Sequence, residues 1–93
     1  MPGYRVVLAP AAQRQLDRLR GSAVVGLRGV ILALGDEPRP SGTVKLAGRR
    51  NLWRIRVRID GRGWRVVYQL RERERLVIVT RVVPRDEGTY RNL

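Results

Sequence analysis

The stretch Leu52–Ile59 reads Leu-Trp-Arg-Ile-Arg-Val-Arg-Ile, and from Trp53 onward it alternates bulky apolar and basic residues without a break. Successive side chains of a β-strand point to opposite faces of the sheet. The pattern therefore predicts a strand with one core face (Trp53, Ile55, Val57, Ile59) and one arginine face (Arg54, Arg56, Arg58). A half-buried strand needs only polarity on its outer face. Three like charges in a row instead indicate an anionic partner such as phosphate.

Charge and length restrict the class of protein. The 93 residues predict one domain, 1–93, and 43% hydrophobic content is typical of a folded chain. Twenty basic residues against eight acidic ones give a net charge of +12, which attracts nucleic acid or an acidic protein. Every basic residue except Lys45 is Arg. The guanidinium group of arginine binds phosphate and stacks on bases, which favours a nucleic-acid partner. A codon bias toward Arg is the alternative explanation of the same composition.

The residue types that are missing exclude several chemistries. The chain has no Cys and no His. The sequence therefore predicts no disulfide, no ordinary zinc site and no His-based acid–base catalysis. We therefore expect neither a metal nor a cofactor. No apolar run approaches the ~20 residues of a membrane span. The expected location is the cytoplasm, with no membrane partner.

Periodicity orders the predicted elements. Residues 4–8 form a first strand, and helical spacing follows over residues 10–19 and 22–34, with Gly21 as the stop between them. Gly26 and Gly29 are expected to allow close packing of the second helix against the first. Strands are predicted at 52–59, 64–70 and 76–83. The fold class is α+β, with the order β-α-α-β-β-β, a mainly antiparallel sheet and a helical hairpin on one face.

Alternation also assigns the later strands to faces. A four-residue loop over residues 60–63 pairs Arg58 with Arg65, which places Arg65 on the arginine face and Trp64, Val66, Tyr68 and Leu70 in the core. If the charged loop over residues 71–75 pairs Leu70 with Leu76, Ile78 belongs to the core. The arginine face then also receives Val77, Val79, Arg81, Val83 and Arg85. The face is read as an anion-binding surface; the alternative is a solvated face of an Arg-rich protein.

Motifs along nearly the whole chain resemble the RelE/ParE toxin superfamily of bacterial type II toxin–antitoxin systems. They are Tyr4-x-Val6-x-Leu8, Lys45-Leu46-x-Gly48, the strand Trp53-Arg54-Ile55-Arg56-Val57, Gly63-Trp64-Arg65-Val66-Val67-Tyr68, and a final Arg85 and Tyr90. The resemblance implies a small toxin that an acidic cognate antitoxin holds inactive. In the RelE-like branch such toxins cleave messenger RNA on the ribosome, so ribosome and mRNA are the implied partners.

The resemblance also implies a catalytic set, namely Arg54, Arg56, Arg65, Arg85 and Tyr90. In addition, the basic residues of the same region are candidates for RNA binding: Lys45, Arg49, Arg50, Arg58 and Arg81. Cleavage would drive the ribose 2′-hydroxyl onto the adjacent phosphorus, which needs a base, charge neutralisation at the phosphate and an acid at the leaving oxygen. RelE-type toxins often carry Lys where this chain has Arg54 and Arg56. Because Arg is not deprotonated in proteins, Tyr90 is the better candidate for the base.

Two other functions remain open at this stage. A ParE-like toxin would inhibit DNA gyrase by protein contact, without nuclease activity. A basic nucleic-acid-binding module would have no toxicity. For Tyr90 the alternative to a catalytic role is a residue that only packs near the end of the chain.

Overall fold

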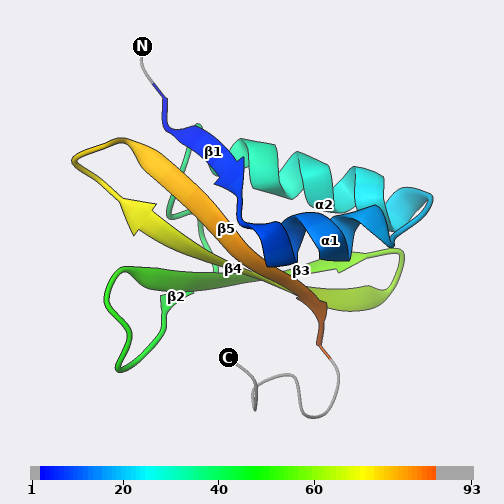
Figure 1. The fold of residues 1–93 in the computed structure, drawn as a ribbon. Coiled ribbons are helices and arrows are strands. Elements are labelled where there is room, and N and C mark those ends of the chain that lie inside the picture. The colour runs from blue at the N-terminus through cyan, green and yellow to red at the C-terminus, as the bar shows by residue number, and fades with distance from the viewer. Residues whose placement is uncertain (1–2, 86–93) are drawn as a thin grey trace.

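The structure, a computed structural model, describes residues 3–85, in which two helices cover one face of a five-stranded sheet (Figure 1). The elements are β1 (Arg5–Leu8), α1 (Pro10–Asp17), α2 (Ser22–Ala33), β2 (Thr43–Lys45), β3 (Leu52–Ile59), β4 (Arg62–Arg71) and β5 (Leu76–Pro84). The predicted α+β class with both helices on one face is confirmed. The short strand β2 is an addition to the predicted order.

The strand order in the sheet is β1-β5-β4-β3-β2. β1 runs parallel to β5, and every other neighbouring pair is antiparallel. This order places β4 in the middle, with β3 and β5 on either side of it. The residues that β4 presents to the face opposite the helices therefore have neighbours on both sides.

The core lies between the helices and the sheet. Helix α1 begins at Pro10, where a missing backbone N–H costs nothing, and Gly21 separates the helices with a φ of 66°. The buried side chains come from both layers: Ala12, Leu16, Leu27, Ile31 and Leu34 from the helical layer, and Ile55, Trp64, Val66, Tyr68, Leu70, Val77, Val79 and Val82 from the sheet. The predicted core positions on β3 and β4 are thus confirmed.

The β3–β4 hairpin has a shorter turn than predicted. Ile59 pairs with Arg62, so only Asp60 and Gly61 form the loop, and both have positive φ, 51° and 80°. Two positive φ angles are what a type I′ turn requires, and Asp-Gly is among its favoured sequences. The predicted pairing of Arg58 with Arg65 is therefore wrong, and Arg56 is opposite Arg65. Because the shift is two residues, every side chain keeps its predicted face.

The β4–β5 register is also wrong in the prediction, and here faces change. Leu70 pairs with Val77, not Leu76, which sends Val77 and Val79 into the core and removes Ile78 from it. The pairing then shifts between Val67 and Tyr68, whose partners are Arg81 and Val79. Thr80 is thus the extra residue of a β-bulge, and beyond it Arg81 and Val83 return to the arginine face.

Two glycines of α2 have different surroundings, and neither matches the predicted packing against α1. A Cβ on Gly26 would lie 2.8 Å from Cδ1 and 3.0 Å from Cγ1 of Ile59 on β3. A Cβ on Gly29 would meet nothing within 4 Å in the described structure. Gly26 therefore permits close approach of α2 to the sheet, whereas Gly29 has no such role.

This difference predicts opposite effects of the same substitution. Gly29→Ala should raise the free energy of unfolding by about 1 kcal/mol through helix propensity alone. Gly26→Ala should lower it by about 1 kcal/mol, because overpacking against Ile59 costs about 1–3 kcal/mol and outweighs the propensity gain. Urea denaturation midpoints of both variants and the wild type measure this. Equal stabilisation by the two substitutions would contradict the packing of Gly26 on β3.

Candidate nucleic-acid interface

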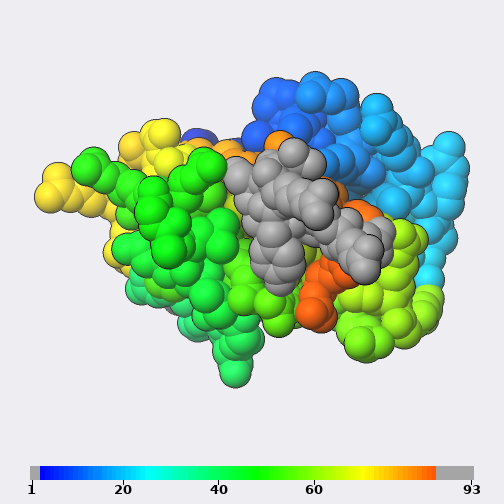
Figure 2. Space-filling view, turned by 90° about the horizontal axis from the view of Figure 1, so that it is seen from below, coloured from blue at the N-terminus to red at the C-terminus, as the bar shows by residue number. Residues whose placement is uncertain are grey.

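The arginine face is the sheet face opposite the helices (Figure 1); in the view from below, Figure 2, the end of β5 (orange) lies beside the β3–β4 hairpin (yellow-green). Cross-strand neighbours share a face. On this face Arg56 of β3 is opposite Arg65 of β4, and Val67 of β4 lies between Arg54 of β3 and Arg81 of β5. Three neighbouring strands therefore bring four arginines together. No Asp or Glu occurs within β3, β4 or β5, so the strands themselves supply no carboxylate to neutralise them.

Arg65 is buried, with 0% of its surface exposed, although the sequence predicts it to be exposed. It lies on the middle strand, with Arg56 beside it on β3 and Val83 beside it on β5. Val67, two residues farther along the same face, is buried as well. A buried guanidinium has lost most of its rotamer freedom during folding, so binding an anion would not need to order it again.

Arg54 and Arg56 lie beside Arg65 with different exposure. Arg54 is half-buried, and Arg56 is exposed. Paired strands thus bring one fully buried, one partly buried and one exposed guanidinium within two residues of each other on the arginine face. A cluster of this kind can neutralise and orient a phosphate through forked N–H donors.

Arg85 joins the same face from beyond the end of β5. Its backbone N–H donates to the carbonyl oxygen of Gly63 at 3.0 Å. A Cβ on Gly63 would lie 3.3 Å from Cδ and 3.5 Å from Cβ of Arg85. Gly63 shares its face with Arg65, two residues farther along β4, so the Arg85 side chain lies over the arginine face at its Gly63 end.

The bulge at Thr80 shapes the other end of the face. The Thr80 hydroxyl donates to the backbone oxygen of Val67 at 3.1 Å. A pocket of about 230 Å³ opens there, lined by Arg49, Leu52, Val67, Thr80 and Arg81. Arg49 and Arg81, both predicted to bind RNA, are therefore neighbours around one pocket although they lie on a loop and on β5.

The remaining predicted residues lie elsewhere. Arg58 turns back to the hairpin loop and donates to the Gly61 carbonyl oxygen at 2.9 Å, and Arg50 is exposed in the loop before β3. Lys45 pairs with Trp53, a core-face residue, and its Nζ lies 6.0 Å from the centre of the Trp53 ring. Lys45 is thus not brought to the arginine face. Tyr90 lies outside the described residues.

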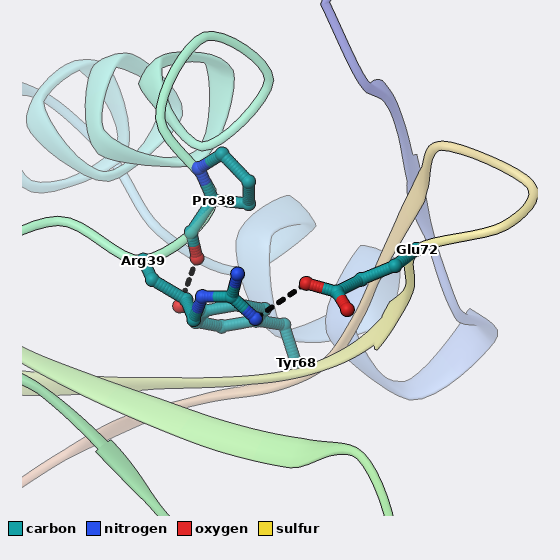
Figure 3. Close-up of polar contacts among 4 residues, drawn as sticks. All are labelled: Pro38, Arg39, Tyr68 and Glu72. Atoms are coloured by element: carbon teal, nitrogen blue, oxygen red, sulfur yellow. Dashed lines mark hydrogen bonds and ion pairs between the residues drawn. The ribbon is translucent and has the colours of Figure 1, made fainter.

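The connector after α2 is attached to the core face (Figure 3). The Tyr68 hydroxyl donates to the Pro38 carbonyl oxygen at 2.5 Å, and Arg39 forms an ion pair with Glu72 at 2.5 Å. Burial raises the pKa of Tyr68, with smaller opposing contributions from Thr43 and Arg39. Tyr68 therefore stays protonated on the face that carries the helices, and it is not a candidate base for chemistry on the arginine face.

The sequence interpretation missed Gly63 and Thr80 as parts of the site. Gly63 was read only as part of a loop and a motif, but its missing side chain makes room for Arg85. Thr80 could have been found from a conflict in the pattern: Val77, Val79 and Arg81 are in phase, yet only the valines suit a core. A bulge resolves such a conflict.

The described residues offer neither a metal-binding cluster nor a membrane-spanning helix. Within 3–85, no group of His, Cys, Asp and Glu side chains could hold a metal ion. Neither helix in this part of the chain has the length and apolar character needed to cross a bilayer.

Solved structures of toxins share this fold. A free Escherichia coli toxin RelE with two arginine-to-alanine substitutions is 21% identical, with a TM-score of 0.76 over 97% of this chain and 92% of that chain. A RelBE toxin–antitoxin complex from Mycobacterium tuberculosis is 24% identical, with a TM-score of 0.74 over 91% and 94%. An archaeal RelE–RelB complex from Pyrococcus horikoshii is 21% identical, with a TM-score of 0.72 over 92% and 99%. At these identities the likeness establishes the fold.

Sequence comparison places the chain in a family. The comparison with curated proteins gave no match. The family model described as the ParE toxin of the type II toxin–antitoxin system, parDE, matches residues 6–88. That range includes every described strand and helix except the first residue of β1. The chain therefore belongs to the ParE toxin family, and it is a type II toxin of the RelE/ParE superfamily with a RelE-like fold.

Proposed function

We propose that this toxin is a metal-independent endoribonuclease that cleaves messenger RNA on the ribosome. The observation that carries the proposal is the direct pairing of Arg56 with Arg65, with Arg85 packed beside them over Gly63. A toxin that acts only by contacting another protein does not need a buried guanidinium among others on an open sheet face. A phosphate in an RNA backbone matches this arrangement in charge and geometry.

The cleavage step follows from the groups present. The ribose 2′-oxygen attacks the adjacent phosphorus, a new P–O bond forms, and the bond to the 5′-oxygen of the next nucleotide breaks. Arg56 and Arg65 stabilise the charge that grows on the phosphate oxygens. Tyr90 is proposed to take the 2′-hydroxyl proton, and Arg85 stabilises the leaving 5′-oxygen, which takes its proton from solvent. The products are a 2′,3′-cyclic phosphate and a 5′-hydroxyl.

The partners follow from the same proposal. Ribosome and mRNA are the target, and the place of action is the cytoplasm. An acidic cognate antitoxin is proposed to hold the toxin inactive; related toxins have been solved in complex with an antitoxin. With a net charge of +12, the toxin should associate with such a partner quickly at low salt and more slowly as salt is raised.

Inhibition of DNA gyrase is the second candidate function. Two observations favour it: the matching family model is described as ParE, and Arg54 and Arg56 stand where RelE-type toxins often have Lys. A guanidinium does not act as a general base. In this alternative the arginine face would contact protein or DNA without cleaving RNA.

Induction of the toxin in bacteria, with bulk translation and plasmid supercoiling measured together, separates the two functions. We expect translation to fall first, supercoiling to remain unchanged, and primer extension on ribosome-bound mRNA to show new 5′ ends. A DNA-damage response with relaxed plasmids and continuing translation would instead support gyrase inhibition. An inactive control, Arg56→Ala with Arg85→Ala, corrects both measurements for the burden of expression.

A further inference from the structure

We infer that the pocket around Val67 binds one nucleobase of a single-stranded RNA, next to the phosphate held by the arginine face. This inference rests on the proposed function and names the part of the substrate that lies beyond the phosphate. Its basis is the composition of the pocket. The lining combines two guanidinium groups, Arg49 and Arg81, with the apolar surfaces of Leu52 and Val67.

The pocket has the form that a base requires. Its volume of about 230 Å³ accommodates one planar heterocycle. Guanidinium groups stack on the faces of bases, and aliphatic side chains make apolar contact with them. The floor is firm, because Val67 is 2% exposed and its backbone oxygen accepts the hydrogen bond from Thr80. A bulged residue therefore stabilises one wall of the pocket.

The position of the pocket relates it to the phosphate site. Val67 is two residues from Arg65 on the same face of β4, a separation of about 7 Å along a strand. That is the span between a base and the phosphate of its own nucleotide. Arg54, directly opposite Val67, lies beside the base position on β3. One nucleotide can thus place its phosphate beside Arg65 and its base above Val67.

The same lining predicts how the base is chosen. Among the described residues, no carboxylate or amide side chain lines the pocket, and the Thr80 hydroxyl already donates to Val67. These residues therefore lack the side chains that read adenine or cytosine edges, whereas Arg49 and Arg81 carry the group that reads O6 and N7 of guanine. Recognition should combine sequence-tolerant stacking with a preference for guanine.

A binding experiment without ribosomes tests the inference. The purified toxin is titrated with a short single-stranded RNA, and with the same RNA carrying one abasic position. We expect the wild type to lose about tenfold in affinity on the abasic RNA, the size of one stacking contact. Arg81→Lys and Arg49→Lys keep the positive charge but replace the planar guanidinium, which can stack on a base, with an ammonium group. They should weaken binding to intact RNA by a similar factor, without affecting the slope of affinity against salt.

Arg14→Lys is the matched control, since Arg14 is exposed on α1 and does not line the pocket. It should bind both RNAs like the wild type. The inference is overturned if the wild type binds intact and abasic RNA equally, or if Arg14→Lys weakens binding as much as Arg49→Lys. It is also overturned if the two pocket variants weaken only the antitoxin complex, which would assign the pocket to a peptide. Because no cleavage is measured, failure of the nuclease proposal leaves this test interpretable.

Discussion

Arg56→Ala is expected to lower the rate of mRNA cleavage on ribosomes about 100-fold or more, the usual loss when one group that stabilises a transition-state charge is removed. Arg56 is exposed and lies opposite Arg65, so its truncation removes charge from the phosphate site without opening the core. The urea midpoint should change little. Arg14→Ala, which removes the same charge from an exposed position of α1, should retain full activity. An equal loss from both variants would show that net charge alone matters.

Arg85→Ala should give a loss of the same size, and Gly63→Val should reproduce it while keeping every charge. A valine side chain at position 63 would occupy the space that Cδ and Cβ of Arg85 now fill. Because both substitutions act through one side chain, their effects should not add: the double variant should be no slower than Arg85→Ala. The measurement is the rate of mRNA cleavage, followed by primer extension, for the wild type, Arg85→Ala, Gly63→Val and the double variant. Additive losses would mean that Gly63 acts independently of Arg85.

Binary patterning predicted the two faces of the sheet and most of the core. In β3 and β4 the alternation is unbroken, so an error of two residues in the hairpin moved Arg58 away from Arg65 without moving any side chain to the wrong face. The two-residue turn was itself readable, since Asp60-Gly61 is a type I′ signal.

The parts that could not be predicted depend on long-range packing. The bulge at Thr80 breaks the phase of β5, so one strand contributes Val79 to the core and Arg81 to the opposite face. Arg65 is buried on the middle strand of the sheet, and strand order is not encoded in the local pattern. β2 was missed because three residues between turns carry too little periodicity. The role of Gly63 appears only when the end of β5 is placed beside the β3–β4 hairpin.

Trp64→Ala is expected to have the largest effect on stability. Trp64 is 3% exposed and belongs to the core cluster beneath the helices, while Arg62 covers its ring at 4.9 Å. Removing a buried Trp side chain costs about 3–5 kcal/mol, much of the ~5–15 kcal/mol that holds a domain folded. Trp64→Phe should cost much less, because the indole N–H is buried without a hydrogen-bond partner among the described residues. Urea unfolding of both variants measures the difference.

The same pair of variants separates folding from chemistry at the Gly-Trp-Arg motif. Trp64 and Arg65 are adjacent in sequence but point to opposite faces of β4, one to the helices and one to the arginine face. Trp64→Phe should therefore cleave mRNA at nearly the wild-type rate, whereas Trp64→Ala should lose activity only in proportion to its unfolded fraction, which low temperature should restore. If Trp64→Phe is stable but fails to cleave, Trp64 contacts RNA and the assignment of faces on β4 is wrong.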